Sequence, residues 1–97
     1  VRCHMPIMTI ILNNAFMSIY ADSRFPVALE KYHVKSLSGQ FSEVARAMGA
    51  YSEKITDPSG IIPAITRGLE ATSAGQTVVL EFMTRDEGEY SKFQFNA

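Results

Sequence analysis

Two adjacent carboxamides, Asn13 and Asn14, stand directly after an apolar run at residues 6–12 that is broken only by Thr9. An apolar, β-branched run that ends in polar residues is typical of a buried parallel strand. Ligands of open α/β sheets bind at the carboxyl ends of such strands, so the pair predicts a ligand site there. Asn-Asn after a strand is also ordinary turn chemistry, because Asn tolerates left-handed backbone and bonds its own chain. Both interpretations stay open at this point.

The other residues that could do chemistry are scattered. Cys3 and His4 could begin a metal site, but no second Cys or suitably spaced His follows, and His33 stands alone. A serine hydrolase of the nucleophile-elbow type needs a G-x-S-x-G motif, which the sequence lacks. No glycine-rich phosphate loop of the Walker or dinucleotide type is present either. These absences weigh against a Cys/His metal site, a hydrolase and a nucleotide-binding protein.

The composition of the chain limits which kind of protein it can be and which partners it can have. The 97 residues, with 46% hydrophobic and 20% charged side chains, are typical of one small soluble domain. A net charge of −1 without blocks of like charge gives no indication of a surface for nucleic acid or acidic membranes. No apolar run is long enough to span a bilayer, and a single cysteine allows no internal disulfide. We therefore expect a cytoplasmic chain whose partners are neither nucleic acid nor membrane.

The elements that would position the asparagines alternate along the chain. Strands are expected at residues 6–14 and 77–83, where apolar and β-type residues gather, and at 50–55, where Tyr51, Glu53 and Ile55 carry an alternating pattern. A helical turn at 15–20 would lie across the first strand end, followed by a loop at 21–26 and an irregular connection at 27–39 with room for a short helix. One helix is predicted from the apolar spacing of Phe41, Val44, Ala45 and Met48, with Gly49 ending it. A second begins at the Asp57 cap, buries Ile61, Ile62, Ile65 and Leu69, and runs to Gly75.

This order predicts the α/β class, with a partial parallel sheet of three strands and flanking helices. Parallel strands need cover on both faces, and these helices are too few to provide it. Residues 1–97 are therefore expected to be the C-terminal half of a larger α/β domain, or to complete themselves by association. Residues 84–97 are expected to form a tail that packs only through Tyr90, Phe93 and Phe95.

Four runs carry a resemblance to a known family: P-I-M-T-I-I-L-N-N-A-F-M-S-I-Y, F-S-E-V-A-R-A-M-G-A, D-P-S-G-I-I-P-A-I and T-V-V-L-E-F. Together they resemble the C-terminal, diphosphate-binding domain of thiamine-diphosphate-dependent enzymes of the acetolactate synthase and 2-oxo-acid decarboxylase type. The resemblance covers roughly residues 2–85, which is the second half of that domain. It implies that the third strand lies between the other two and leaves the first strand on an edge.

The resemblance also implies roles for individual residues. Asn14 corresponds to a carboxamide ligand of Mg²⁺, and Phe16 to a residue whose backbone carbonyl is a second ligand. Asn13 corresponds to the residue that holds the strand end and its loop. Met17, Ile19 and Tyr20 fall where the family lines the thiazolium and substrate side of the cleft, with simple core packing as the alternative. The implied cofactors are thiamine diphosphate and Mg²⁺.

Two parts of the family's machinery are absent from the sequence. There is no Gly-Asp-Gly motif to supply a further Mg²⁺ ligand, and the family's activating Glu belongs to a separate domain. The first hypothesis is therefore a fragment of an enzyme that decarboxylates or carboligates 2-oxo acids. Such a fragment would be inactive alone and would depend on the remainder of the parent enzyme or on a homo-oligomer. The alternative is a free-standing, non-catalytic interaction or oligomerisation module derived from that domain.

Overall fold

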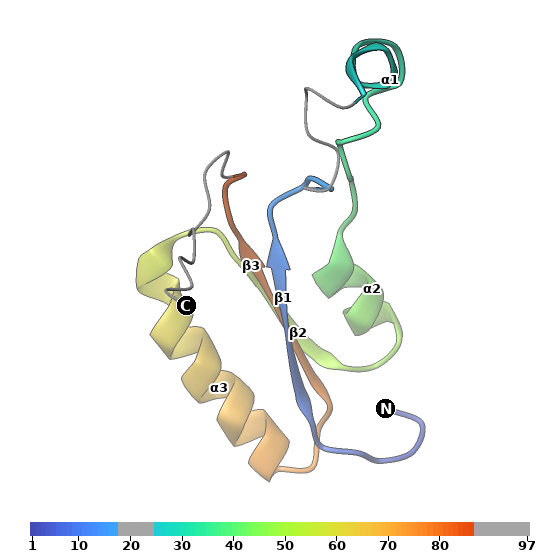
Figure 1. Cartoon of the computed structure of the whole chain (residues 1–97). Coiled ribbons are helices and arrows are strands. Elements are labelled where there is room, and N and C mark those ends of the chain that lie inside the picture. Colours follow the sequence, from blue (N-terminus) through green and yellow to red (C-terminus); the bar gives the residue numbers. More distant parts are fainter. Residues whose placement is uncertain (18–24, 87–97) are drawn as a thin grey trace, which may run out of the picture.

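The structure is a computed structural model that describes residues 1–17 and 25–86. In chain order the elements are β1 (Met8–Asn13), α1 (Pro26–Tyr32), α2 (Phe41–Ala47), β2 (Tyr51–Ile55), the 3₁₀ turn η1 (Pro58–Gly60), α3 (Ile61–Ser73) and β3 (Val78–Met83) (Figure 1). The strands form one parallel sheet in the order β1-β3-β2. The predicted α/β class and the central position of the third strand are confirmed.

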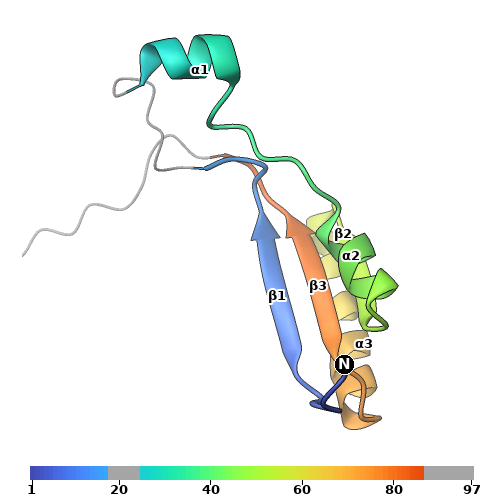
Figure 2. The same ribbon diagram turned by 90° about the vertical axis from the view of Figure 1, so that its right-hand side faces the viewer.

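Both outer strands pair with β3 along their whole length. Met8 lies opposite Val78 and Asn13 opposite Met83, while β2 pairs with β3 from Tyr51 to Ile55. The three carboxyl ends therefore meet at one edge of the sheet, as parallel pairing requires. β1 has no strand on its outer side within the described residues, and Figure 2 shows it at the sheet margin beside β3.

The connection from β2 to β3 places α3 on one face of the sheet, and the connection from β1 to β2 places α2 on the other face (Figure 1). The core lies mainly between α3 and the sheet, where Met8, Tyr51, Ile61 and Ile65 pack around the buried residues Ile55, Ala64, Ala71, Val78, Leu80 and Phe82. Helix α3 follows directly from η1, whose N-cap is Asp57 with Pro58 after it, as the sequence predicts. Gly75 ends this segment with a φ of 89°.

The predicted buried stripe of α3 is half wrong. Ile61 and Ile65 pack on the core, but Ile62 and Leu69 are 71% and 56% exposed. The sheet instead meets the small residues Ala64, Gly68 and Ala71. A Cβ on Gly68 would lie 2.8 Å from Met8 Cε and 3.3 Å from Val78 Cγ1, so the helix packs closely on the sheet at this point and Met8 would have to shift. Close approach of the two layers thus overrides the ordinary apolar spacing.

Helix α2 ends before Gly49, which has a φ of 91°, as predicted. Its expected apolar face is not covered, because Val44 and Met48 are exposed. The cause is the position of the helix, which contacts β2 and β3 and leaves β1 uncovered on this side. No helix of the described residues is long and apolar enough to cross a membrane.

The helical turn expected at residues 15–20 is absent from its described part. Ala15 has a φ of 61°, and Phe16 forms an antiparallel bridge with Ser36. The left-handed Ala15 and the pairing of Phe16 with Ser36 replace the helical start, and the Asn13 and Asn14 side chains bond the Ala15 and Phe16 N–H groups of this turn. The connection expected to be largely irregular contains α1, which buries none of its residues and stands away from the sheet (Figure 2). Ile19, Tyr20 and the aromatic residues of the expected tail lie outside the described residues.

Candidate functional site at the carboxyl edge of the sheet

Asn13 is a buried connector at the end of β1. Its Nδ2 donates to Glu81 Oε2 at 2.7 Å, and its Oδ1 accepts the Ala15 N–H at 2.9 Å. The carboxamide is thereby bonded on both sides within the protein. Asn13 holds the strand end and the loop that follows, and its burial, at 7% exposure, makes it less accessible to a ligand than the half-buried Asn14.

Glu81 lies in the centre of β3 and is fully buried. Besides Asn13, its carboxylate accepts the Ser42 backbone N–H at 2.9 Å. Ser42 is the second residue of α2, whose own N-cap, Gln40, makes no side-chain cap. A carboxylate from the sheet therefore caps this helix, which satisfies a free backbone donor and opposes the positive end of the helix dipole.

Burial alone would raise the pKa of Glu81, but the hydrogen bonds from Ser42 and Asn13 outweigh it and hold the pKa below its ordinary value. Sequence reasoning treated Glu81 as part of a strand and missed this role. The available signal was an acidic residue inside the apolar run V-V-L-E-F-M, since a buried carboxylate needs partners.

Asn14 is half-buried at the same edge, and its Oδ1 accepts the Phe16 N–H at 3.0 Å. The left-handed Ala15 lies between them, so residues 13–16 form two overlapping Asx turns. The turn interpretation of the asparagine pair is thus confirmed. It does not exclude a ligand role for Asn14, because a carboxamide oxygen carries a second lone pair.

Asn14 Oδ1 and the Phe16 carbonyl are neutral oxygen donors, which is the type that Mg²⁺ accepts. Their chemistry suits two of its six ligand positions. Among residues 1–17 and 25–86, no three His, Cys, Asp or Glu side chains gather where a metal ion could be held. A magnesium ion here would need the oxygens of its bound ligand and of further residues to complete its shell.

A second segment runs alongside this turn. The Met17 N–H donates to the Lys35 carbonyl at 2.7 Å, and the Leu37 N–H to the Ala15 carbonyl at 2.8 Å. This pairing brings Lys35 Nζ to 5.6 Å from the centre of the Phe16 ring. Lys35 also forms an ion pair with Asp86, which follows β3, at 3.0 Å. We refer to Asn14, Phe16, Lys35 and Asp86 as the edge cluster.

The remaining implied residues contribute less to the edge cluster. Met17 is exposed, and it joins the cluster only through its backbone bond to Lys35. Ile19 and Tyr20 cannot be located, because they lie outside the described residues. Sequence reasoning did not find Lys35 and Asp86, since their contacts join segments far apart in the chain.

Both helix starts at this edge already carry a carboxylate of the chain itself. Glu81 caps α2, and the Asp57 side chain accepts the Ser59 N–H at 2.8 Å and the Ser59 hydroxyl at 2.6 Å at the start of η1. The side-chain and backbone hydrogen bonds from Ser59 lower the pKa of Asp57. Helix N-termini are common sites for phosphate. Here the acidic caps leave neither of the two free for that purpose.

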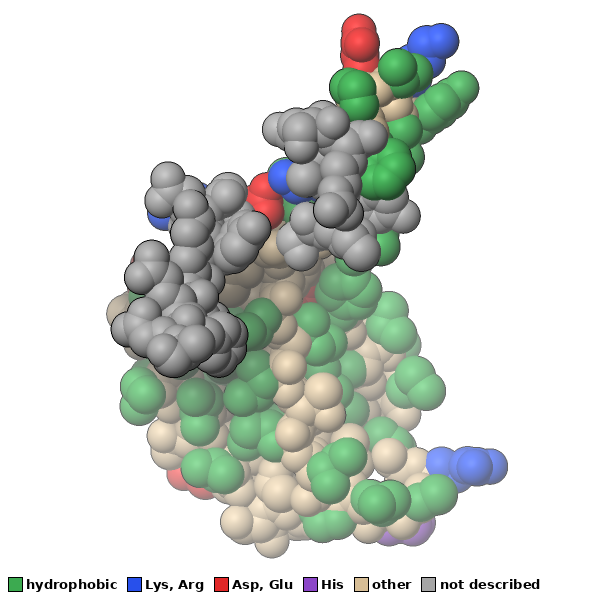
Figure 3. All heavy atoms as spheres, viewed as in Figure 1, with side chains coloured by type: hydrophobic (Ala, Val, Ile, Leu, Met, Phe, Trp, Pro, Cys, Tyr) green, Lys and Arg blue, Asp and Glu red, His purple; other side chains and the backbone are tan. Residues whose placement is uncertain are grey.

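A cavity among the described residues lies away from the edge cluster. It measures about 700 Å³ and runs between α2 and the uncovered face of β1, and we call it the β1 groove. Its apolar lining includes Ile7, Ile11, Phe41, Val44, Met48 and Val79. Figure 3 shows exposed hydrophobic side chains gathered over this margin of the sheet. The β1 groove offers shape and apolar surface but little polar chemistry.

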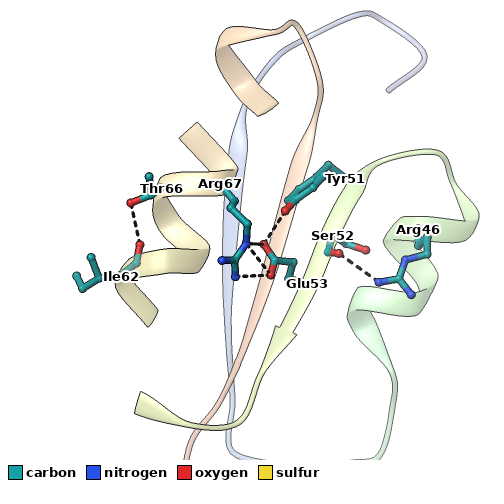
Figure 4. A network of polar contacts seen from close by, with 7 residues as sticks. All are labelled: Arg46, Tyr51, Ser52, Glu53, Ile62, Thr66 and Arg67. Carbon is teal, nitrogen blue, oxygen red and sulfur yellow. Dashed lines mark hydrogen bonds and ion pairs between the residues drawn. The ribbon is translucent and has the colours of Figure 1, made fainter. Parts of the chain in front are cut away.

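A polar network on the opposite margin of the sheet joins β2 to α3 (Figure 4). Arg67 donates to both carboxylate oxygens of Glu53, with Nη2 at 2.7 Å from Oε1, and the Tyr51 hydroxyl donates to Glu53 Oε2 at 2.7 Å. The Arg67 hydrogen bond lowers the pKa of Glu53 against the opposing effect of burial, and the Glu53 hydrogen bond raises the pKa of Tyr51. All three side chains are paired, so the network is a structural brace.

Comparison of the chain with protein-family models, with curated proteins and with solved structures gives no match. A function therefore has to be argued from the fold and from the chemistry of the edge cluster.

Proposed function

We propose that this chain is the C-terminal half of a thiamine-diphosphate-binding domain and that it contributes Asn14 and Phe16 to a site for Mg²⁺ and the cofactor's diphosphate. One observation carries the proposal. The parallel sheet has its third strand between the other two and ends its edge strand in the Asn13–Asn14 turn, which is the arrangement that the resemblance implies.

Within this proposal each residue of the turn has a distinct task. Asn13 fixes the strand end through Glu81, and this fixes the start of the turn. Asn14 Oδ1 and the Phe16 carbonyl would bind the metal ion, which in turn would bind diphosphate oxygens. When bound, thiamine diphosphate supplies the carbanion chemistry for decarboxylation or carboligation of a 2-oxo acid.

The chain alone is expected to be inactive. The sequence lacks the Gly-Asp-Gly motif and the activating Glu that the resemblance would require, and the described residues add no acidic cluster to the two neutral oxygens. For the isolated chain the remaining ligands would come from another copy of the chain, the diphosphate and water, and in a parent enzyme also from the remainder of that enzyme. The absence of a membrane-spanning helix among the described residues and the single cysteine are compatible with the cytoplasm.

The test is titration calorimetry of the purified chain with thiamine diphosphate, with Mg²⁺ and again with a chelator. We expect saturable binding that depends on Mg²⁺, that is lost in Asn14→Ala, and that survives in Asn14→Asp because a carboxylate is also a Mg²⁺ ligand. Gln76→Ala, at an exposed position beyond α3, is the control. Binding that ignores the chelator or the loss of Asn14 would refute the proposal, as would the absence of binding.

A second candidate function is a non-catalytic association module, and a separate observation favours it. The outer edge of β1 carries no charged residue from Met8 to Asn13, and Ile10 and Leu12 are 44% and 69% exposed. Natural edge strands are usually protected by charges, prolines or bulges. Together with the β1 groove, this unprotected edge favours pairing of β1 with another polypeptide.

A further inference from the structure

We propose that Lys35 contacts the anionic oxygens of a diphosphate bound at the Asn14–Phe16 turn, and that Asp86 is the internal counterion that this ligand displaces. The inference rests on the proposed function and deepens it by naming a ligand contact that the resemblance does not supply. It concerns only residues of this chain.

The first support is position. Two backbone hydrogen bonds, Met17 N–H to the Lys35 carbonyl and Leu37 N–H to the Ala15 carbonyl, align residue 35 beside the turn. The Lys35 ammonium then lies 5.6 Å from the centre of the Phe16 ring, within the range of a cation–π contact. The cation is therefore held against the same residue whose carbonyl is the proposed metal ligand.

The second support is charge. A diphosphate needs positive partners, and the usual alternative to a basic side chain is a helix N-terminus. Both helix starts at this edge are occupied by the carboxylates of Glu81 and Asp57. Because these caps add negative charge near the edge, a bound diphosphate needs a nearby cation to offset the repulsion, and Lys35 can supply it.

The third support is that the existing partner of Lys35 can be replaced. The ion pair with Asp86 spans 3.0 Å, but its side chains keep 21% and 23% exposure. Because breaking a buried pair is costly mainly when a charge is left unpaired, replacing Asp86 by another anion avoids most of that cost for Lys35. A phosphate oxygen offers a stronger, charge-assisted partner, and the flexible lysine stem can turn from Asp86 toward it.

The experiment measures the affinity of the full chain for two probes, inorganic pyrophosphate and thiamine diphosphate, each with Mg²⁺, by calorimetry. We expect Lys35→Met to weaken both probes about tenfold or more, the loss expected for one charge-assisted hydrogen bond. We expect Lys35→Arg to keep most of the affinity, and Asp86→Asn to tighten binding severalfold because it releases Lys35. Lys31→Met removes the same charge from the exposed α1 and should leave the affinity unchanged.

Lys35→Met and Asp86→Asn are expected to change the affinity in opposite directions, and this separates ligand binding by Lys35 from a purely structural role. If Lys35 and Asp86 only brace the loops, Asp86→Asn weakens binding as Lys35→Met does, and the inference is wrong. Unchanged affinity in Lys35→Met, or no binding of either probe, also overturns it. Pyrophosphate binding that depends on Lys35, without any gain from the thiamine moiety, would retain the anion contact and refute the proposed function instead. Thermal unfolding of each variant verifies that it is folded.

Discussion

Asn13 Nδ2 lies 2.7 Å from Glu81 Oε2, although the two residues are 68 positions apart in the chain. The same carboxylate accepts the backbone N–H of Ser42 at the start of α2. One buried acidic side chain thus joins the end of the edge strand, the central strand and a helix. The geometry of the asparagine turn therefore depends on a residue of β3 as well as on its own sequence.

Glu81→Gln is expected to lower the free energy of unfolding by about 1–3 kcal/mol, because the new amide N–H₂ must face one of the donors that the carboxylate now satisfies. Urea denaturation measures the change. Glu70→Gln, at an exposed position on α3, is the matched control and should stay within about 0.5 kcal/mol of the parent. Equal stability of the two variants would contradict the role given to Glu81.

The stability should also depend on pH through this group. Burial raises the pKa of Glu81, but hydrogen bonds lower it further, so the folded chain holds the pKa below that of an unfolded Glu, about 4.3. The stabilisation is then complete above the unfolded pKa and is lost as the pH falls through the lower folded pKa. The stability difference between the parent and Glu81→Gln should shrink in this acid range, and a difference that stayed constant would exclude the mechanism.

Tyr51 should ionise at a higher pH than an ordinary tyrosine, chiefly because its hydroxyl donates to the Glu53 carboxylate and also because of burial. Replacing Glu53 by Gln should lower this pKa. Ultraviolet titration of tyrosinate measures it, with Tyr51→Phe identifying the signal. The raised pKa adds stability below the unfolded pKa, about 10, and that stability disappears as the pH rises through the folded value. An unchanged titration in Glu53→Gln would contradict the hydrogen bond.

Self-association should be sensitive to charge on the outer strand. We expect light scattering to give a mass that rises with concentration for the parent chain, and a monomer for Ile10→Lys, because a lysine protects a free strand edge. Ile62→Lys adds the same charge on exposed α3 and should leave association unchanged. If both variants behave like the parent, the edge of β1 is not the surface through which copies meet.

Short apolar runs predict β1 and β3, the alternation of Tyr51, Glu53 and Ile55 predicts β2, and the strand order follows from the family resemblance. The prediction failed on α3, where Ile62 and Leu69 were expected inside and Gly68 lies there instead. Hydrophobic spacing reports which residues favour burial. It does not report how closely two layers approach, and that distance decides in favour of the smaller residue.

Some residues of the candidate site could be predicted from the sequence and others could not. Asn13 and Asn14 could be assigned to the carboxyl edge because their position follows from the strand that they end. Lys35, Asp86 and Glu81 could not, since each acts through a partner brought near by the fold. For Glu81 the sequence offers one signal, an acidic residue within an apolar strand, which indicates a buried carboxylate with partners.

The order of the strands has a consequence for how the chain forms during synthesis. Among the described residues β1 and β2 each pair only with β3, which follows both of them in the chain. Neither of these strands can gain its ladder hydrogen bonds to β3 until residues 78–83 have been synthesised, and these contacts are long-range and slow to form. The strand Met8–Asn13 must therefore wait for its β3 partner while the segment between them is made. That interval is when this protein is most exposed to aggregation and to chaperones.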